Sequence, residues 1–274
     1  MHEDSSRFRA GTVAIVLSLT AGGFGAADPP VPPLITDRPD QTESSDTVPA
    51  GYLQLEVGWT HTEDDENTRV IKDSFPETLA RLGMADRFEL RLGFDGYIWQ
   101  DTDQAGAKGS THDGNGDTEI GFKYKLFEEE GMQPQGAVLC GLTLPTGESP
   151  FSSERIDPSV RLAFSHTVSD RLSLGYNAAV VWASEDDAGG ERDTTASWVY
   201  SAVLGIELSE RLGTFIEYFS EIPTGSGEGP ANSFDAGFTC LAKDNLQFDV
   251  LGGVGLSDQA DDWFAGAGFV YRTR

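Results

Sequence analysis

The stretch Asp86-Arg87-Phe88-Glu89-Leu90-Arg91-Leu92-Gly93-Phe94 carries the pattern that decides the fold. From Phe88 onward, apolar side chains occupy every second position, and charged residues or glycine lie between them. A period of two is typical of a β-strand whose two faces meet different environments, because successive side chains point to opposite faces. The pattern predicts a strand from 88 to 98, with Ile98 on its apolar face.

The same alternation recurs along most of the chain after the proline-rich residues 29–33. We expect strands, the second of them the least regular, over 51–60, 74–83, 88–98, 119–126, 138–144, 160–168, 172–182, 198–208, 212–218, 234–240, 246–256 and 263–271. The apolar faces of the regular strands contain no Asp, Glu, Lys or Arg. Such a face tolerates lipid, which predicts an all-β fold: a transmembrane, antiparallel, up-and-down β-barrel of about twelve strands.

The connections between these strands alternate between short and long. Short polar turns cover 85–87, 169–171, 209–211 and 243–245, and a looser one covers 128–133. The longer stretches, rich in Asp and Glu, cover 63–67, 100–117, 145–157, 185–193, 221–232 and 258–262. Short periplasmic turns and long external loops are typical of outer-membrane barrels. The external acidic residues are either solvated loops or groups that hold divalent cations and draw cationic solutes toward the mouth.

Tryptophan positions give a separate indication of a membrane boundary. All five lie where a strand meets a long stretch: Trp59, Trp99, Trp182, Trp198 and Trp263. Amphipathic rings favour the membrane–water boundary, where aromatic girdles form. Trp99 has the inward parity of the strand 88–98, so it fits this girdle less well.

The first 27 residues are expected to be an export signal peptide. Arg7 and Arg9 precede a short apolar stretch at 12–20, and small residues follow at 25–27. Residues 28–50 are then a periplasmic N-terminal lead-in, and residues 51–274 are the barrel. We expect the mature chain in the bacterial outer membrane. Its net charge of −26 disfavours binding to nucleic acid.

The polar faces of the strands would point into the lumen of this barrel. Candidates for lining a solute path are Arg81, Glu89, Arg91, Glu119, Lys123, Lys125, Arg161, Glu207 and Glu217. These charges form either a structural network or a solute path, since an unpaired buried charge is costly. Glycines share the same faces and leave room. About twelve strands would enclose a narrow pore, between the filled eight-stranded and the open sixteen-stranded barrels.

The sequence carries little that indicates catalysis or metal binding. His166 lies on an apolar face with no nucleophile nearby. Residues 113–117 alternate Asp and Asn with glycine, but the glycine and glutamate that a calcium loop requires are replaced at Thr118 and Tyr124. Cys140 and Cys240 fall on the outer faces of distant strands, which predicts two free thiols. We expect no enzyme, no cofactor and no metal.

Several motifs are similar to those of one protein family. They are Thr36-Asp37-Arg38-Pro39-Asp40, Thr42-Glu43-Ser44, Gln54-Leu55-Glu56, Arg81-Leu82-Gly83, the stretch 86–91, Ile120-Gly121-Phe122-Lys123-Tyr124-Lys125 and Leu142-Thr143-Leu144-Pro145-Thr146-Gly147. Together they resemble bacterial outer-membrane transporters linked to the meta-pathway of phenol degradation, over nearly all of the mature chain. The resemblance implies a barrel for passage of small, aromatic or hydrophobic solutes, and it supplies no catalytic residue. The expected partners are outer-membrane lipid, the barrel-assembly machinery and a small-molecule solute.

Residues 36–44 precede the first strand and are too polar to belong to it. One hypothesis is that they fold into the periplasmic mouth and pair with lumen charges such as Arg81 or Arg91. The alternative is a periplasmic strap or a loose lead-in. Two other classes of protein also remain open: a secreted soluble β-barrel or sandwich that binds a ligand, and an outer-membrane barrel that conducts nothing.

Overall fold

The computed structural model describes residues 32–65, 68–103, 109–186, 192–225, 227 and 229–273. The predicted signal peptide and the start of the lead-in lie outside the described residues. The strands are β1 (Leu53–Asp64), β2 (Arg69–Ala85), β3 (Phe88–Phe94), β4 (Tyr97–Asp103), β5 (Ser110–Asn115), β6 (Thr118–Phe127), β7 (Gln135–Leu144), β8 (Asp157–Ser169), β9 (Leu172–Asp186), β10 (Arg192–Ser209), β11 (Leu212–Thr224), β12 (Ala231–Lys243), β13 (Leu246–Gly255) and β14 (Trp263–Thr273). Within these described ranges, no helix has the length and apolarity needed to span a bilayer.

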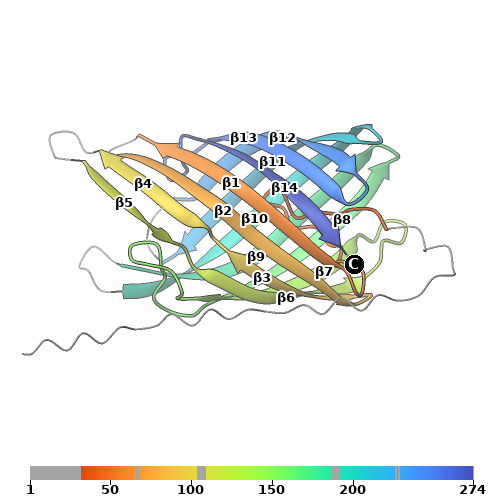
Figure 1. Cartoon of the computed structure of the whole chain (residues 1–274), viewed down its shortest axis with the longest axis horizontal. Helices are drawn as coiled ribbons and strands as arrows, with labels where there is room; N and C mark the ends of the chain where they lie inside the picture. Colours follow the sequence, from red (N-terminus) through yellow and green to blue (C-terminus); the bar gives the residue numbers. More distant parts are fainter. Residues whose placement is uncertain are drawn as a thin grey trace, which may run out of the picture. The chain divides into compact units, whose positions relative to one another are not determined.

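The strands close into one barrel (Figure 1). The ring runs β1-β2-β3-β6 and then in chain order to β14, which pairs with β1 along residues 53–63. Every neighbouring pair in the ring is antiparallel, as an up-and-down barrel requires. Since β4 and β5 stand outside the ring, twelve of the 14 strands form it, which confirms the predicted barrel.

The region 95–117 differs from the prediction of one strand followed by a loop. β3 ends at Phe94, and the chain turns at Asp95 and Gly96, whose φ is 90°. β4 then pairs with the first part of β2, and β5 pairs with β4, so this hairpin extends the wall at one end. The turn shifts the alternation of faces by one residue. Ile98 is therefore buried, and Trp99 is 46% exposed, the reverse of the expected parity.

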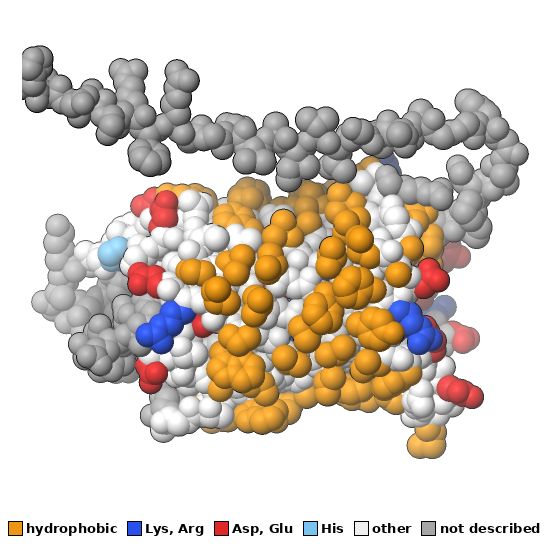
Figure 2. All heavy atoms as spheres, turned by 90° about the horizontal axis from the view of Figure 1, so that it is seen from below, with side chains coloured by type: hydrophobic (Ala, Val, Ile, Leu, Met, Phe, Trp, Pro, Cys, Tyr) orange, Lys and Arg blue, Asp and Glu red, His pale blue; other side chains and the backbone are white. Residues whose placement is uncertain are grey.

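The two faces of the barrel wall have opposite polarity. Outward-facing Leu92, Phe238 and Val250 are each more than half exposed, and Figure 2 shows apolar side chains across the middle of the visible face with charged groups toward both ends. The inner side chains of Arg81 and Lys123 are fully buried. A soluble barrel would place its apolar side chains inside. The observed polarity is that of a transmembrane barrel.

The two ends of the barrel differ as the sequence predicts. Tight turns join β2 to β3, β8 to β9, β10 to β11 and β12 to β13 at what we call the short-turn end. The opposite end, the long-loop end, carries the exposed side chains of Trp59, Trp198 and Trp263. Cys140 and Cys240 are both free, as predicted from their strand positions.

Residues 145–156, the β7–β8 loop, are tied to the turn between β5 and β6. The carboxylate of Asp117 accepts hydrogen bonds from the N–H of Gly147 at 2.8 Å and of Ser153 at 2.7 Å. Burial raises the pKa of Asp117, but these two backbone N–H groups outweigh it and hold the pKa below its usual range. The Asp117 carboxylate is therefore ionised when it holds the β7–β8 loop against the turn between β5 and β6.

Candidate functional site

Residues 32–50, which we call the lumen segment, run inside the ring of strands before β1 begins (Figure 1). Arg272 of β14 holds the start of the segment by donating hydrogen bonds to the carbonyl oxygens of Pro32 and Pro33. At the other end of the segment, the backbone of Pro49 packs directly against Gly83 of β2. The approach is so close that a Cβ on residue 83 would lie 2.1 Å from the carbonyl oxygen of Pro49. The lumen segment is thus attached to the wall at both ends.

Asp37 lies at the centre of a buried cluster of charges. Its Oδ2 is 3.0 Å from Arg81 Nη1, 2.6 Å from Arg91 Nη1 and 2.9 Å from Lys123 Nζ. Burial alone would raise the pKa of Asp37, but these three cations hold the pKa well below its usual range. One carboxylate from the lumen segment therefore neutralises three cations of the wall together.

Two wall carboxylates, Glu56 and Glu89, and Glu43 of the lumen segment complete the cluster around Arg81 and Arg91. These two arginines face each other across β2 and β3, so they repel unless carboxylates separate them. Glu89 Oε1 lies 2.9 Å from Arg81 Nε and 3.0 Å from Arg91 Nη1. Glu56 Oε1 lies 3.0 Å from Arg81 Nη1, and both carboxylate oxygens of Glu43 lie 2.8 Å from Arg91 Nη2. Each cationic side chain of this cluster is therefore paired with at least one carboxylate, as burial of a charge requires.

Arg38 of the lumen segment fits a slot made by two glycines. Gly58 of β1 and Gly268 of β14 are partners in the ladder that closes the barrel. A Cβ on Gly58 would lie 2.0 Å from the Arg38 guanidinium, and a Cβ on Gly268 would lie 2.6 Å from Arg38 Nε. Arg38 Nη2 lies 3.3 Å from Asp249 Oδ1. Glycine at these two positions therefore makes the space that an arginine fills.

The wall on the other side of the lumen binds the backbone of the segment. Glu217 accepts hydrogen bonds from the N–H of Gln41 at 2.7 Å and from the hydroxyl of Thr42. Asn177 accepts from the N–H of Glu43 at 2.8 Å and donates to its carbonyl oxygen at 3.0 Å. These contacts fix the register of the segment in the lumen.

The structure places the nine predicted lumen residues in different surroundings. Four of them surround Asp37: Arg81, Glu89, Arg91 and Lys123. Three others contact the lumen segment elsewhere: Lys125, Arg161 and Glu217. Glu119 is half-buried on β6, and Glu207 is exposed near the short-turn end of β10. The pairing of residues 36–44 with Arg81 and Arg91 occurs as hypothesised.

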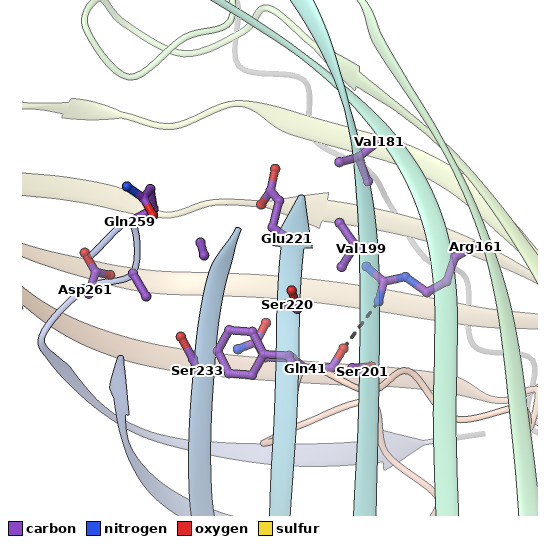
Figure 3. Close-up of a pocket in the computed structure, with 13 residues that line it drawn as sticks. Gln41, Arg161, Val181, Val199, Ser201, Ser220, Glu221, Ser233, Gln259 and Asp261 are labelled. Atoms are coloured by element: carbon purple, nitrogen blue, oxygen red, sulfur yellow. Dashed lines mark hydrogen bonds between the residues drawn. The ribbon is translucent and has the colours of Figure 1, made fainter. Parts of the chain in front are cut away.

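A cavity of about 400 Å³, the vestibule, lies between the lumen segment and the β13–β14 loop (Figure 3). Gln41 of the lumen segment and Ser201 of β10 line it. Figure 3 shows Arg161 of β8 on one side and Asp261 of the β13–β14 loop on the other, with Glu221 of β11 between them. The vestibule is thus a chamber lined by both charged and apolar side chains, in contact with the segment that fills the lumen.

Residues 36–273 match the family model described as "Putative MetA-pathway of phenol degradation". A search of curated proteins finds no match. The COG4313 outer membrane channel from Pseudomonas putida F1 has a TM-score of 0.66 at 13% identity, covering 84% of this chain and 98% of that one. The translocator domain of the autotransporter NalP from Neisseria meningitidis has a TM-score of 0.57 at 10% identity, covering 83% of this chain and 90% of that one. The NanC porin has a TM-score of 0.51 at 10% identity, covering 81% of this chain and 100% of that one. At these identities the likeness shows a common fold, that of outer-membrane β-barrels.

Proposed function

The chain belongs to the family of the MetA-pathway of phenol degradation, and from that premise we propose that it is an outer-membrane channel for small solutes, closed by its own lumen segment. The observation that carries this proposal is the filling of a polar, charged lumen by a segment that joins no strand. The short-turn end then faces the periplasm and the long-loop end faces outward.

The way the lumen segment is held supports a removable closure. Its contacts are ion pairs and hydrogen bonds from side chains, and water can replace each of them when the segment leaves. The ladder between β1 and β14 runs without interruption along residues 53–63, so release of the segment breaks no strand pairing. A barrel with a purely structural role would not require a lumen segment that can leave the lumen.

The charges of the lumen wall favour polar or dipolar solutes over plain hydrocarbons. Basic groups lie on β2, β3, β6 and β8, where Glu56 and Glu89 neutralise part of their charge. The inner faces of β11, β12 and β13 carry the carboxylates of Glu217, Asp235 and Asp249. A field across the lumen orients a solute that carries separated charge or a polar group on an apolar ring. Small aromatic compounds with a polar substituent, the class suggested by the family description, meet this requirement.

Liposome swelling and planar-bilayer conductance test the proposal. The full chain is compared with a variant lacking residues 36–47, which keeps the anchor at Val48 and Pro49. Gel mobility with and without heating reports whether each barrel is folded, since a folded barrel resists unfolding in detergent. We expect little passage through the full chain and faster passage through the deletion variant. Two folded barrels that both conduct nothing would favour the structural-barrel alternative.

A further inference from the structure

The vestibule carries opposite charges on its two sides. The Arg161 guanidinium lies on one side, and the carboxylate of Asp261 lies on the other beside Gln259 (Figure 3). Glu221 lines the same chamber between them. A solute with a single charge would meet one opposite charge and one like charge here. A solute with both charges would meet a partner at each side.

Arg161 is placed to receive a carboxylate. Its Nη1 donates to the carbonyl oxygen of Gln41 at 3.4 Å and to Asn177 Oδ1 at 3.2 Å, and both distances are long for such bonds. A carboxylate accepts two short, parallel hydrogen bonds from a guanidinium, and both partners of that pair are charged, whereas a carbonyl oxygen is neutral. A bound carboxylate would therefore compete well with the carbonyl oxygen of the lumen segment.

The rest of the lining suits a small apolar group with hydrogen-bonding edges. Phe219 lines the chamber and packs edge-on against Phe264, with ring centroids 5.9 Å apart. Val181 and Val199 add an aliphatic surface, and the hydroxyl of Ser201 lies nearby. A volume of about 400 Å³ is within the range of sites that hold small molecules.

We propose that the vestibule binds a small zwitterion of the amino-acid type with an apolar side chain. Its carboxylate pairs with Arg161, its ammonium group faces Glu221 and Asp261, and its side chain packs on Phe219. The inference rests on the proposed function only in naming a solute that the channel would pass.

Calorimetric titration of the full chain in detergent tests the charge requirement with three probes of one shape. L-Phenylalanine carries both charges, 3-phenylpropionate carries only the carboxylate, and 2-phenylethylamine carries only the ammonium group. We expect phenylalanine to bind roughly tenfold or more tightly than either single-charge probe, since each buried charged hydrogen-bond pair contributes about that factor. Equal affinities, or no binding of phenylalanine, would overturn the inference.

Variants assign each charge to its side of the chamber. Arg161→Gln should lower the affinity for phenylalanine roughly tenfold and raise that for phenylethylamine, which loses a like charge. Glu221→Gln combined with Asp261→Asn should lower the affinity for phenylalanine and raise that for phenylpropionate for the same reason. Gln247→Ala is the control, because Gln247 donates a hydrogen bond to Thr36 of the same lumen segment at 3.2 Å and is outside the vestibule lining. It should leave the discrimination among probes intact.

Variants that change the affinity for all three probes alike would overturn the assignment. Conductance measured on the same preparations separates this inference from the proposed function. A chain that conducts without discriminating among the probes overturns only the zwitterion site. A folded chain that discriminates and never conducts, even without residues 36–47, overturns only the channel.

Discussion

Replacing Asp37 by Asn tests whether the ion cluster holds the lumen segment in place. The amide keeps the shape of the side chain and can still accept a hydrogen bond, but it loses the charge shared by Arg81, Arg91 and Lys123. The substitution leaves three buried cations with one carboxylate fewer. We expect the segment to leave the lumen more often while the barrel itself stays folded.

The magnitude follows from the burial of Asp37, whose side chain is 2% exposed. Removing one partner of a buried ion pair costs about 3–5 kcal/mol. The value here should lie at the low end, because Glu89 and Glu43 still neutralise part of the charge. About 3 kcal/mol raises the ratio of released to docked segment roughly 100-fold, at 1.4 kcal/mol for each factor of ten.

Single-channel recording measures this ratio as the fraction of time spent in the high-conductance state. Asp46→Asn is the matched control, since Asp46 pairs with Lys125 at 2.9 Å while its side chain is 29% exposed. A pair that is partly open to solvent contributes less than a fully buried one, about 1 kcal/mol, so the control should change the ratio roughly fivefold. Equal effects of the two variants, with both barrels folded, would refute the argument from burial.

Three further outcomes follow from particular contacts. Gly58→Val fills the Arg38 slot and should raise the open fraction, whereas Gly252→Ala, whose Cβ would meet its nearest atom at 3.8 Å, should leave that fraction unchanged in the same recordings. Asp117→Asn should speed hydrogen exchange in the β7–β8 loop roughly tenfold, because a buried acceptor is weakened by about 1–3 kcal/mol; unchanged exchange would contradict the tether. Because the pKa of Asp37 is held well below its usual range, its stabilisation is complete above the ordinary carboxyl pKa and is lost only as the pH falls through the lowered one. The effect of Asp37→Asn on the open fraction should therefore still be present at about pH 5, and its disappearance by that pH in recordings would contradict the lowered pKa of Asp37.

Alternation of side chains predicted the barrel because each strand meets lipid on one side and polar groups on the other. The rule holds along β6, where Lys123 is fully buried and Leu126 is 39% exposed. The rule failed at Asp95 and Gly96. The sequence alternates with a period of two as far as Ile98, but the chain turns at these two residues. The Asp-Gly pair was the available signal, because this dipeptide favours turns. A single strand was predicted where the chain leaves β3 and begins a hairpin.

The candidate site could be predicted only in part. Inward parity identified Arg81, Arg91 and Lys123 as lumen groups, and the polar character of residues 36–44 led to the hypothesis that they pair with such charges. The particular partners could not be derived, because the lumen segment has no periodicity and its position depends on the register of β1, β2, β3 and β6. The role of Arg38 could not be predicted for the same reason, although glycines are expected to leave room on the inner faces.

The slot for Arg38 has a consequence for the order of assembly. One half of it belongs to β1 and the other half to β14, the first and last strands of the barrel. Neither strand alone provides the space or the nearby Asp249, so the arginine has nowhere to sit while the ends of the sheet are apart. Arg38 can therefore take its place only after β1 and β14 have paired, whereas the Asp37 cluster needs only β1, β2, β3 and β6.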